Sequence, residues 1–241
     1  MRKHISTIIT AIIFLTGLSL LLYPTVSNFW NSKHQTQAVA EYSDRIEKMG
    51  VQEKKQALEQ AAQYNQTLVS DAGRFTPSEE QDALYKSLLN ADGTGMMGYI
   101  TIPEIKCKLA LYHTVDDSVL QVGIGHLEGS SLPVGGTGTH CVLSGHRGLP
   151  SAKLFTDLDK LQKGDVFLLH IMIRFLHMRL TRFVLWNREI MGRLRLKRIR
   201  ICVPFLPVHH MESIHRDCWC VDRESRIVQV MIPGLLRMPQ R

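Results

Sequence analysis

A histidine at the end of a short apolar segment is the residue whose type and position best suit chemistry. Residues 138–146 form a mostly apolar run that ends at His146, and Gly148 and Pro150 then interrupt the chain. We predict a strand here, because the run is short and bounded by glycine. A strand that ends on a histidine can present a general acid or base at the rim of a sheet. Taken alone, a histidine beside glycine is more often a structural residue of a loop or core.

The residues after His146 predict the elements that must hold it in place. Ser151 suits the N-cap of a helix. Apolar residues then recur at helical spacing, at Leu154, Phe155, Leu158 and Leu161. Gly164 would end this helix, and Asp165–Leu169 would begin the next strand. The sequence therefore predicts a strand, helix and strand in succession, with His146 at the end of the first strand.

The chain changes character after about residue 170. Of its 29 Lys and Arg and 22 Asp and Glu, 14 basic and 5 acidic residues fall in 171–241, so this tail carries +9 and residues 1–170 carry −2. The tail has 13 Arg and 1 Lys, whereas residues 1–170 have 4 Arg and 11 Lys. A basic tail invites a polyanion-binding interpretation, but the abrupt switch between the two basic residues needs its own explanation.

The N-terminus predicts a membrane anchor over residues 1–25. Ile5–Tyr23 contains no charged residue and is preceded by Arg2 and Lys3, and Pro24 would end it. A segment of this length can cross a bilayer, and the leading positive charges favour a cytoplasmic N-terminus with the rest of the chain outside. A cleaved signal peptide is the alternative, but the apolar run is long for one. We expect a single N-terminal span in the cell membrane.

Residues 26–92 predict a helical segment outside the membrane, and residues 93–170 predict strands. Apolar residues of 38–70 lie loosely at helical spacing, and 79–89 suits a short helix. From residue 97 the period changes to two, with Cys107, Leu109 and Leu111 alternating with other residues. Cys107 is therefore expected to be a small core residue and not a nucleophile.

Three stretches between residues 97 and 170 resemble a known family. They are GYITIPEIKCKLALYHT at 98–114, HLEGSSLPVGG at 126–136 and LSGHRGLPSAKLFTDLDKLQKGD at 143–165. Together with the N-terminal anchor and helical segment, they resemble a sortase of class C, the kind that assembles pili. The resemblance covers roughly a third of the chain.

This resemblance implies a mainly β fold, a closed β-barrel that is incomplete in this chain, behind the transmembrane helix and the helical segment. It also implies a cysteine transpeptidase that cleaves LPXTG-like sorting signals and joins the acyl group to an amine, such as a pilin lysine. His146 aligns with the catalytic histidine, and Asp71 and Phe75 are candidates for a lid loop, although the proline of the family's lid motif is missing. No cofactor, metal or nucleic acid is expected.

The catalytic cysteine and arginine motifs of the family do not occur in residues 171–241. If the reading frame begins at the third base of each codon, however, residues 174–182 permit Val-Leu-Ala-Tyr-Glu-Val-Asp-Gln-Ile. Residues 205–210 permit Ser-Thr-Cys-Thr-Pro-Tyr, and 211–221 permit Gly-Val-Asn-Thr-Gln-Arg-Leu-Leu-Val-Arg-Gly. These are sortase-like strands in the expected order. We therefore interpret 171–241 as out-of-frame translation, expected to be poorly ordered, in a chain expected to be catalytically defective.

Two other interpretations of the chain remain open. It can be a membrane-anchored remnant without catalysis, or a basic protein that binds polyanions through Arg188–Arg200. A zinc site in the tail is disfavoured, because its Cys and His spacing matches no closed pattern; these residues are Cys202, His209, His210, His215, Cys218 and Cys220.

Overall fold

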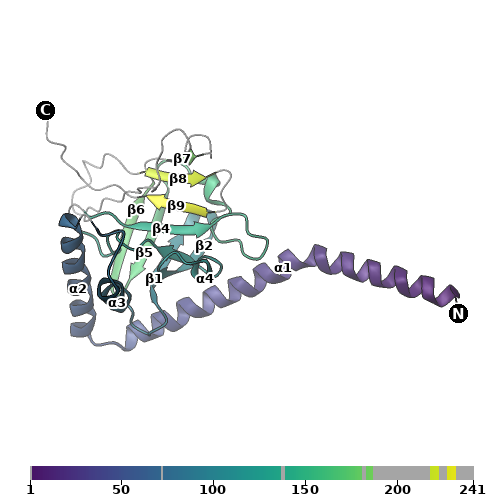
Figure 1. The fold of residues 1–241 in the computed structure, drawn as a ribbon. Coiled ribbons are helices and arrows are strands. Elements are labelled where there is room, and N and C mark those ends of the chain that lie inside the picture. The colour runs from purple at the N-terminus through teal and green to yellow at the C-terminus, as the bar shows by residue number, and fades with distance from the viewer. Residues whose placement is uncertain are drawn as a thin grey trace.

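Helices come first along the chain and strands follow (Figure 1). The computed structural model describes residues 2–71, 73–136 and 139–180, and three further strands at 183–186, 218–222 and 227–231. The helices are α1 (Arg2–Lys48), α2 (Val51–Ser70), α3 (Glu79–Ser87) and α4 (Asp117–Leu120), with short 3-10 turns η1 (Pro103–Ile105) and η2 (Leu158–Lys160). The strands are β1 (Met96–Ile102), β2 (Cys107–His113), β3 (Ile124–His126), β4 (Val142–His146), β5 (Val166–Ile171), β6 (Arg174–Arg179), β7 (Phe183–Trp186), β8 (Cys218–Asp222) and β9 (Ile227–Met231).

The strands form one mixed sheet in the order β6-β5-β1-β2-β3-β4-β9-β8-β7. The pairs β2–β3 and β7–β8 are parallel and the others are antiparallel. The apolar side chains of β1 and β5 meet in the core, where Ile100 lies opposite Leu169 in register and both are fully buried. The mainly β fold predicted from the sequence is confirmed.

The sheet, as far as the structure describes it, is not closed, which agrees with the prediction of a barrel that is incomplete in this chain. Within the described residues, β6 pairs only with β5 and β7 only with β8, so these two strands are the edges. Closing a barrel requires both edges to meet in one fixed register. Register is specified by alternating apolar and polar side chains, and the sequence after His170 lacks a sustained pattern of that kind.

Helix α1 is a single long helix that projects away from the sheet at its N-terminal end and bends part of the way along (Figure 1). We predicted that the helix would end at Pro24, but Pro24 lies inside α1. A proline inside a helix removes one backbone hydrogen bond and bends the helix without necessarily ending it. The N-terminal part of α1 is long and apolar enough to cross a membrane, and its apolar side chains are exposed.

The C-terminal part of α1 and helix α2 lie against the sheet and adjoining loops. The buried hydroxyl of Tyr42 donates a hydrogen bond to the Met97 carbonyl (2.7 Å) and accepts one from the Met172 amide (3.0 Å). The Asn65 side chain of α2 bonds both backbone groups of Leu132, at 3.0 and 2.7 Å. These bonds satisfy buried backbone groups of the β-domain with side chains of the helical segment.

The residues after Ser151 do not form the predicted α-helix. They form turns, and then the 3-10 turn η2 at Leu158–Lys160. All four apolar side chains of the pattern are nevertheless buried, namely Leu154, Phe155, Leu158 and Leu161. The spacing therefore predicted which side chains face the core. It did not predict the backbone, because successive turns can direct the same residues to the core as a helix would.

Residues 171–180, which we placed in the basic tail, complete β5 and form β6. β6 pairs along its whole length with β5, from Arg174 opposite Ile171 to Arg179 opposite Val166. Beyond residue 180, the described part of the tail consists of the backbones of β7, β8 and β9. We expected residues 171–241 to be poorly ordered. Apart from 171–180 and these three strands, the residues of the tail lie outside the described part of the chain.

Candidate active site

His146 is the last residue of β4, as predicted. The four preceding residues of β4 are buried, whereas His146 is partly exposed. β4 pairs with β3 and β9, and its register places His146 opposite Ile227. The site is therefore at the end of an internal strand, where the backbone is fixed and the side chain reaches the surface.

The residue before His146 must be glycine. A Cβ atom at Gly145 would lie 2.7 Å from Cδ2 of Phe155, which is too close for any carbon contact. Phe155 is fully buried, so its ring packs directly on the backbone of β4. The Phe155 ring thus fills the space that a side chain at position 145 would occupy, and it supports the end of β4.

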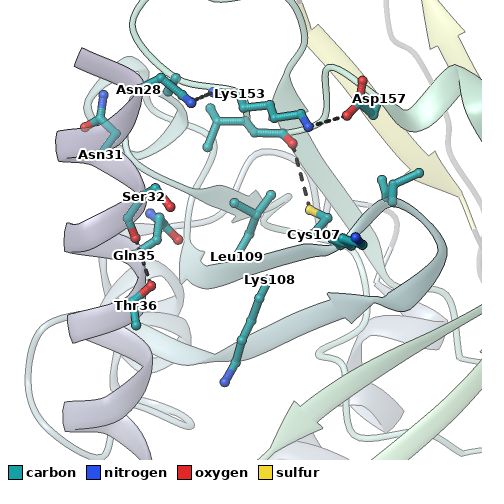
Figure 2. A pocket seen from close by; sticks show the side chains of 14 residues that line it. Asn28, Asn31, Ser32, Gln35, Thr36, Cys107, Lys108, Leu109, Lys153 and Asp157 are labelled. Atoms are coloured by element: carbon teal, nitrogen blue, oxygen red, sulfur yellow. Dashed lines mark hydrogen bonds and ion pairs between the residues drawn. The ribbon is translucent and has the colours of Figure 1, made fainter. Parts of the chain in front are cut away.

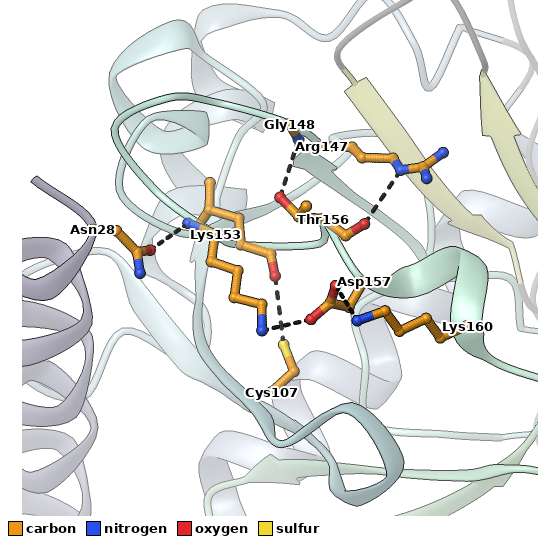
Figure 3. Close-up of polar contacts among 9 residues, drawn as sticks. Asn28, Cys107, Arg147, Gly148, Lys153, Thr156, Asp157 and Lys160 are labelled. Atoms are coloured by element: carbon orange, nitrogen blue, oxygen red, sulfur yellow. Dashed lines mark hydrogen bonds and ion pairs between the residues drawn. The ribbon is translucent and has the colours of Figure 1, made fainter. Parts of the chain in front are cut away.

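A network of hydrogen bonds ties the loop after His146 back to the strand. The Phe155 amide donates to the His146 carbonyl (3.1 Å). The Gly148 amide donates to Oγ1 of Thr156 (3.1 Å), and Nε of Arg147 donates to the Thr156 carbonyl (3.4 Å) (Figure 3). The loop therefore folds back on itself, with its return half bonded to residues 146–148.

Three ion pairs complete the loop, and two of them share the carboxylate of Asp157. Nη2 of Arg147 lies 2.5 Å from Oδ2 of Asp159. Asp157 accepts hydrogen bonds from Lys153 (2.5 Å) and Lys160 (2.8 Å), and these bonds lower the pKa of its carboxyl (Figure 3). Because the lysine side chains are largely exposed, each pair adds little stability. The polar network orients the loop more than it stabilises the fold.

The two cysteines with described side chains are unsuited to nucleophilic attack. Burial raises the pKa of the Cys107 thiol to about 12, and Sγ lies 3.8 Å from the Leu154 carbonyl. Cys141 is fully buried, which also raises its pKa. The thiolate is the reactive form, so neither thiol is activated. Cys141 belongs to the core, whereas Cys107, predicted as a core residue, is partly buried and packs against the core from its edge.

The cysteines of the tail are not placed beside His146 by the described backbone. Cys218 and Cys220 lie on β8, and β9 separates β8 from β4. Adjacent strands are about 4.8 Å apart, so β8 and β4 are separated by about 10 Å. Cys202, His209, His210 and His215 lie outside the described residues.

The candidate lid residues lie in the turn after α2. Oδ1 of Asp71 accepts a hydrogen bond from the Gly73 amide (2.7 Å). Phe75 is partly buried against Gly129, where a Cβ atom would lie 2.7 Å from Cδ1 of Phe75. The guanidinium of Arg74 lies 5.0 Å from the centre of the Phe75 ring. The segment is thus docked on the loop between β3 and β4, which leads into the strand of His146.

Two histidines that sequence reasoning did not single out belong to the core. His126 is fully buried between the hydroxyl of Tyr85, 3.0 Å from Nδ1, and the carbonyl of Ser131, 2.9 Å from Nε2. The two ring nitrogens of His113 contact the carbonyls of Gly95 and Leu88, each at 2.8 Å. Burial lowers the pKa of both histidines and keeps His126 neutral. At His113 the two carbonyls oppose the effect of burial, because carbonyls only accept and each favours a proton on the ring nitrogen that faces it.

Comparison with known proteins places these features in a family. A family model described as the sortase domain matches residues 100–175, which include His146. No curated protein matches the chain. Among solved structures, the chain is similar to sortase C1 from Streptococcus agalactiae, at 33% identity and a TM-score of 0.60, with 85% of this chain and 100% of that chain covered.

Two further solved structures show similar agreement. Sortase C of Streptococcus pneumoniae is 35% identical, covering 59% of this chain and 72% of that chain, with a TM-score of 0.51. Sortase C of Clostridium perfringens, solved in complex with a C-terminal cell wall sorting signal motif, is 37% identical, covering 60% and 69%, with a TM-score of 0.50. The three similar structures are all sortases of class C.

Proposed function

Because the chain belongs to the sortase family of cysteine transpeptidases, we propose that His146 is the catalytic acid of a class C enzyme acting on LPXTG-like sorting signals. The observation that carries this proposal is the position of His146 at the exposed end of β4, within the matched segment. The relative from C. perfringens binds a cell wall sorting signal motif, which supports the same substrate class here.

The proposed reaction has two acyl transfers. A cysteine thiolate attacks the Thr-Gly carbonyl of the signal, the C–N bond breaks, and His146 protonates the departing glycine amine. An acceptor amine, such as a pilin lysine, then gives up a proton and attacks the thioester, which releases the cysteine. An arginine stabilises the oxyanion in both steps.

We propose that this chain is catalytically defective, because it lacks the cysteine and arginine needed for these steps. Cys107 is partly buried and Cys141 is buried, both thiols have raised pKa values, and no tail cysteine lies in a sortase-like motif. The protein sequence permits the missing motifs in another reading frame, with the cysteine across Pro207–Val208 and the arginine across Arg216–Asp217. Loss of one base near His170 would produce this sequence.

The proposed organisation follows the sequence. Residues 1–25 anchor the chain in the cell membrane, and residues 26–92 connect the anchor to the β-domain outside, with Asp71 and Phe75 in a lid loop. Residues 93–170 form the first part of the sortase domain, and 171–241 replace the rest. The docking of Phe75 on Gly129 supports a loop that contacts the β-domain.

Sequencing the locus tests the frame shift. We expect a single-base difference near the His170 codon when the locus is compared with related genes, followed by codons for the cysteine and arginine motifs in the alternative frame. An intact frame whose alternative codons do not encode those motifs would refute the proposal and favour the non-catalytic remnant.

A further inference from the structure

Three side chains of α1 bind the loop that follows His146. Oγ of Ser27 and Nδ2 of Asn31 donate hydrogen bonds to the Ser151 carbonyl, at 3.1 and 2.6 Å. Oδ1 of Asn28 accepts one from the Lys153 amide, at 2.8 Å (Figure 3). These residues are about 120 positions apart in the chain, and they join the helix to the loop through backbone groups. We refer to Ser27, Asn28 and Asn31 as the α1 clamp.

A cavity with a polar α1 side lies beside the clamp. This cavity of about 250 Å³ lies between α1, β2 and the loop (Figure 2). The α1 side of the cavity is lined by polar residues, namely Asn28, Asn31, Ser32, Gln35 and Thr36. At the rim of this cavity, the three hydrogen bonds of the clamp join the helix to the loop.

Helix α1 is itself fixed one turn further along. The buried side chain of Gln35 accepts a hydrogen bond from the Ala110 amide of β2, at 2.7 Å. The next residues of the helix bury Val39 and Tyr42 in the core. The clamp therefore belongs to a helix that is held on the sheet, so it can serve as a fixed support for the loop.

A short path of bonded groups joins the clamp to His146. Lys153, bound by Asn28, is two residues from Phe155, whose amide donates to the His146 carbonyl and whose ring packs on Gly145. Between them, Leu154 has a φ of 34°, in the left-handed region that side-chain-bearing residues rarely adopt. Such a conformation persists only where the surrounding contacts hold it.

We propose that Ser27, Asn28 and Asn31 are positioning residues, through which the membrane-proximal part of α1 holds residues 151–155 and thereby fixes His146. The role of His146 rests on the proposed function, whereas the clamp goes beyond it. The consequence is that the anchor helix is part of the active-site architecture and is more than a tether.

The opposite hydrogen-bonding roles of the two asparagines allow a sharp test. Asn28 acts as an acceptor, so Asn28→Asp should keep its bond to the Lys153 amide, and Asn28→Ala should lose it. Asn31 acts as a donor, so Asn31→Asp should place a carboxylate against the Ser151 carbonyl and lose its bond. Thr36→Val is the matched control, because Thr36 lines the same cavity but bonds only Ser32 of its own helix.

Hydrogen exchange of the full chain in detergent micelles, read by mass spectrometry, measures how firmly each variant holds the backbone of the loop. We expect amides of 151–157 to exchange about tenfold faster in Asn28→Ala and Asn31→Asp, with β1 and β2 unchanged. Asn28→Asp and Thr36→Val should match the parent protein. NMR of the histidine side chains should show shifted ring resonances for His146 in the two disrupting variants alone, which a general loss of stability would not produce.

Equal exchange in all four variants would refute the clamp, as would identical behaviour of Asn28→Asp and Asn28→Ala. Faster exchange of 151–157 with unshifted His146 ring resonances would refute the positioning role. If a variant loses β1 and β2 protection as well, the Ser27→Ala and Asn31→Ala single variants give the same comparison with smaller changes. Neither measurement needs enzyme activity, so failure of the clamp and failure of the proposed catalysis give different results.

Discussion

Replacing His126 by glutamine should make the folded protein less sensitive to acid. The His126 ring is fully buried, and Nε2 lies 2.9 Å from the Ser131 carbonyl, which can only accept. The neutral ring therefore carries its proton on Nε2, which leaves Nδ1 as an acceptor. The Tyr85 hydroxyl lies 3.0 Å from Nδ1 and also donates to the His126 carbonyl at 3.1 Å. Burial lowers the pKa of His126 to about 3, with the Ser131 hydrogen bond opposing this effect.

The magnitude follows from the difference between the folded and unfolded pKa values. An unfolded histidine has a pKa near 6.5, so between about pH 6.5 and 3 the unfolded chain binds one proton more than the folded chain. The free energy of unfolding therefore falls as the pH falls through this range. From pH 7 to pH 5 the loss due to His126 is about 2 kcal/mol.

Urea unfolding of the full chain in micelles at pH 7 and pH 5 measures this loss. We expect His126→Gln to be less stable than the parent at pH 7, because the packing is disturbed, but to lose about 2 kcal/mol less between the two pH values. His34→Gln, at an exposed histidine of α1, is the control and should match the parent. Equal acid sensitivity of the parent and His126→Gln would show that His126 is protonated in the folded state and refute the reasoning.

Three further predictions concern the core around the site. Phe155→Ala should lower the free energy of unfolding by about 3–5 kcal/mol in urea titrations, because a fully buried ring is removed; a loss below 1 kcal/mol would contradict the packing. Tyr42→Phe should cost about 1–3 kcal/mol, since the Met97 carbonyl and Met172 amide lose their buried partner; unchanged stability would argue against these bonds. Cys107 should react with iodoacetamide at pH 8 roughly a thousandfold more slowly than an exposed thiol, as mapped by mass spectrometry; fast alkylation of the folded chain would contradict its burial.

Local sequence patterns predicted those elements in which the spacing of apolar residues and the residues at the ends indicate the same structure. The short helix predicted at 79–89 is α3, which begins with reciprocal bonds between Ser78 and Gln81. The alternation from Cys107 to Leu111 predicted β2, but Ala110 is buried along with Leu109 and Leu111. The sequence of β2 could not show this, because α1 covers that face through Gln35.

The position of His146 could be predicted, whereas its surroundings could not. Strand and glycine signals are local, so they located the end of β4. The bonds that hold the following loop come from Asn28 and Asn31, about 120 residues away. A polar residue on a helix carries no sequence signal for so distant a partner. Spacing alone also did not distinguish a helix from successive turns after Ser151.

The central claim is that a sortase active site is encoded with its histidine in this chain and its cysteine and arginine in another frame. Cleavage of a fluorogenic LPXTG peptide by the chain and by a frame-restored version tests it most directly. We predict turnover by the restored protein alone, and a loss of at least about 100-fold when it carries His146→Ala. Cleavage by the unrestored chain, or a restored protein whose activity does not depend on His146, would contradict the account.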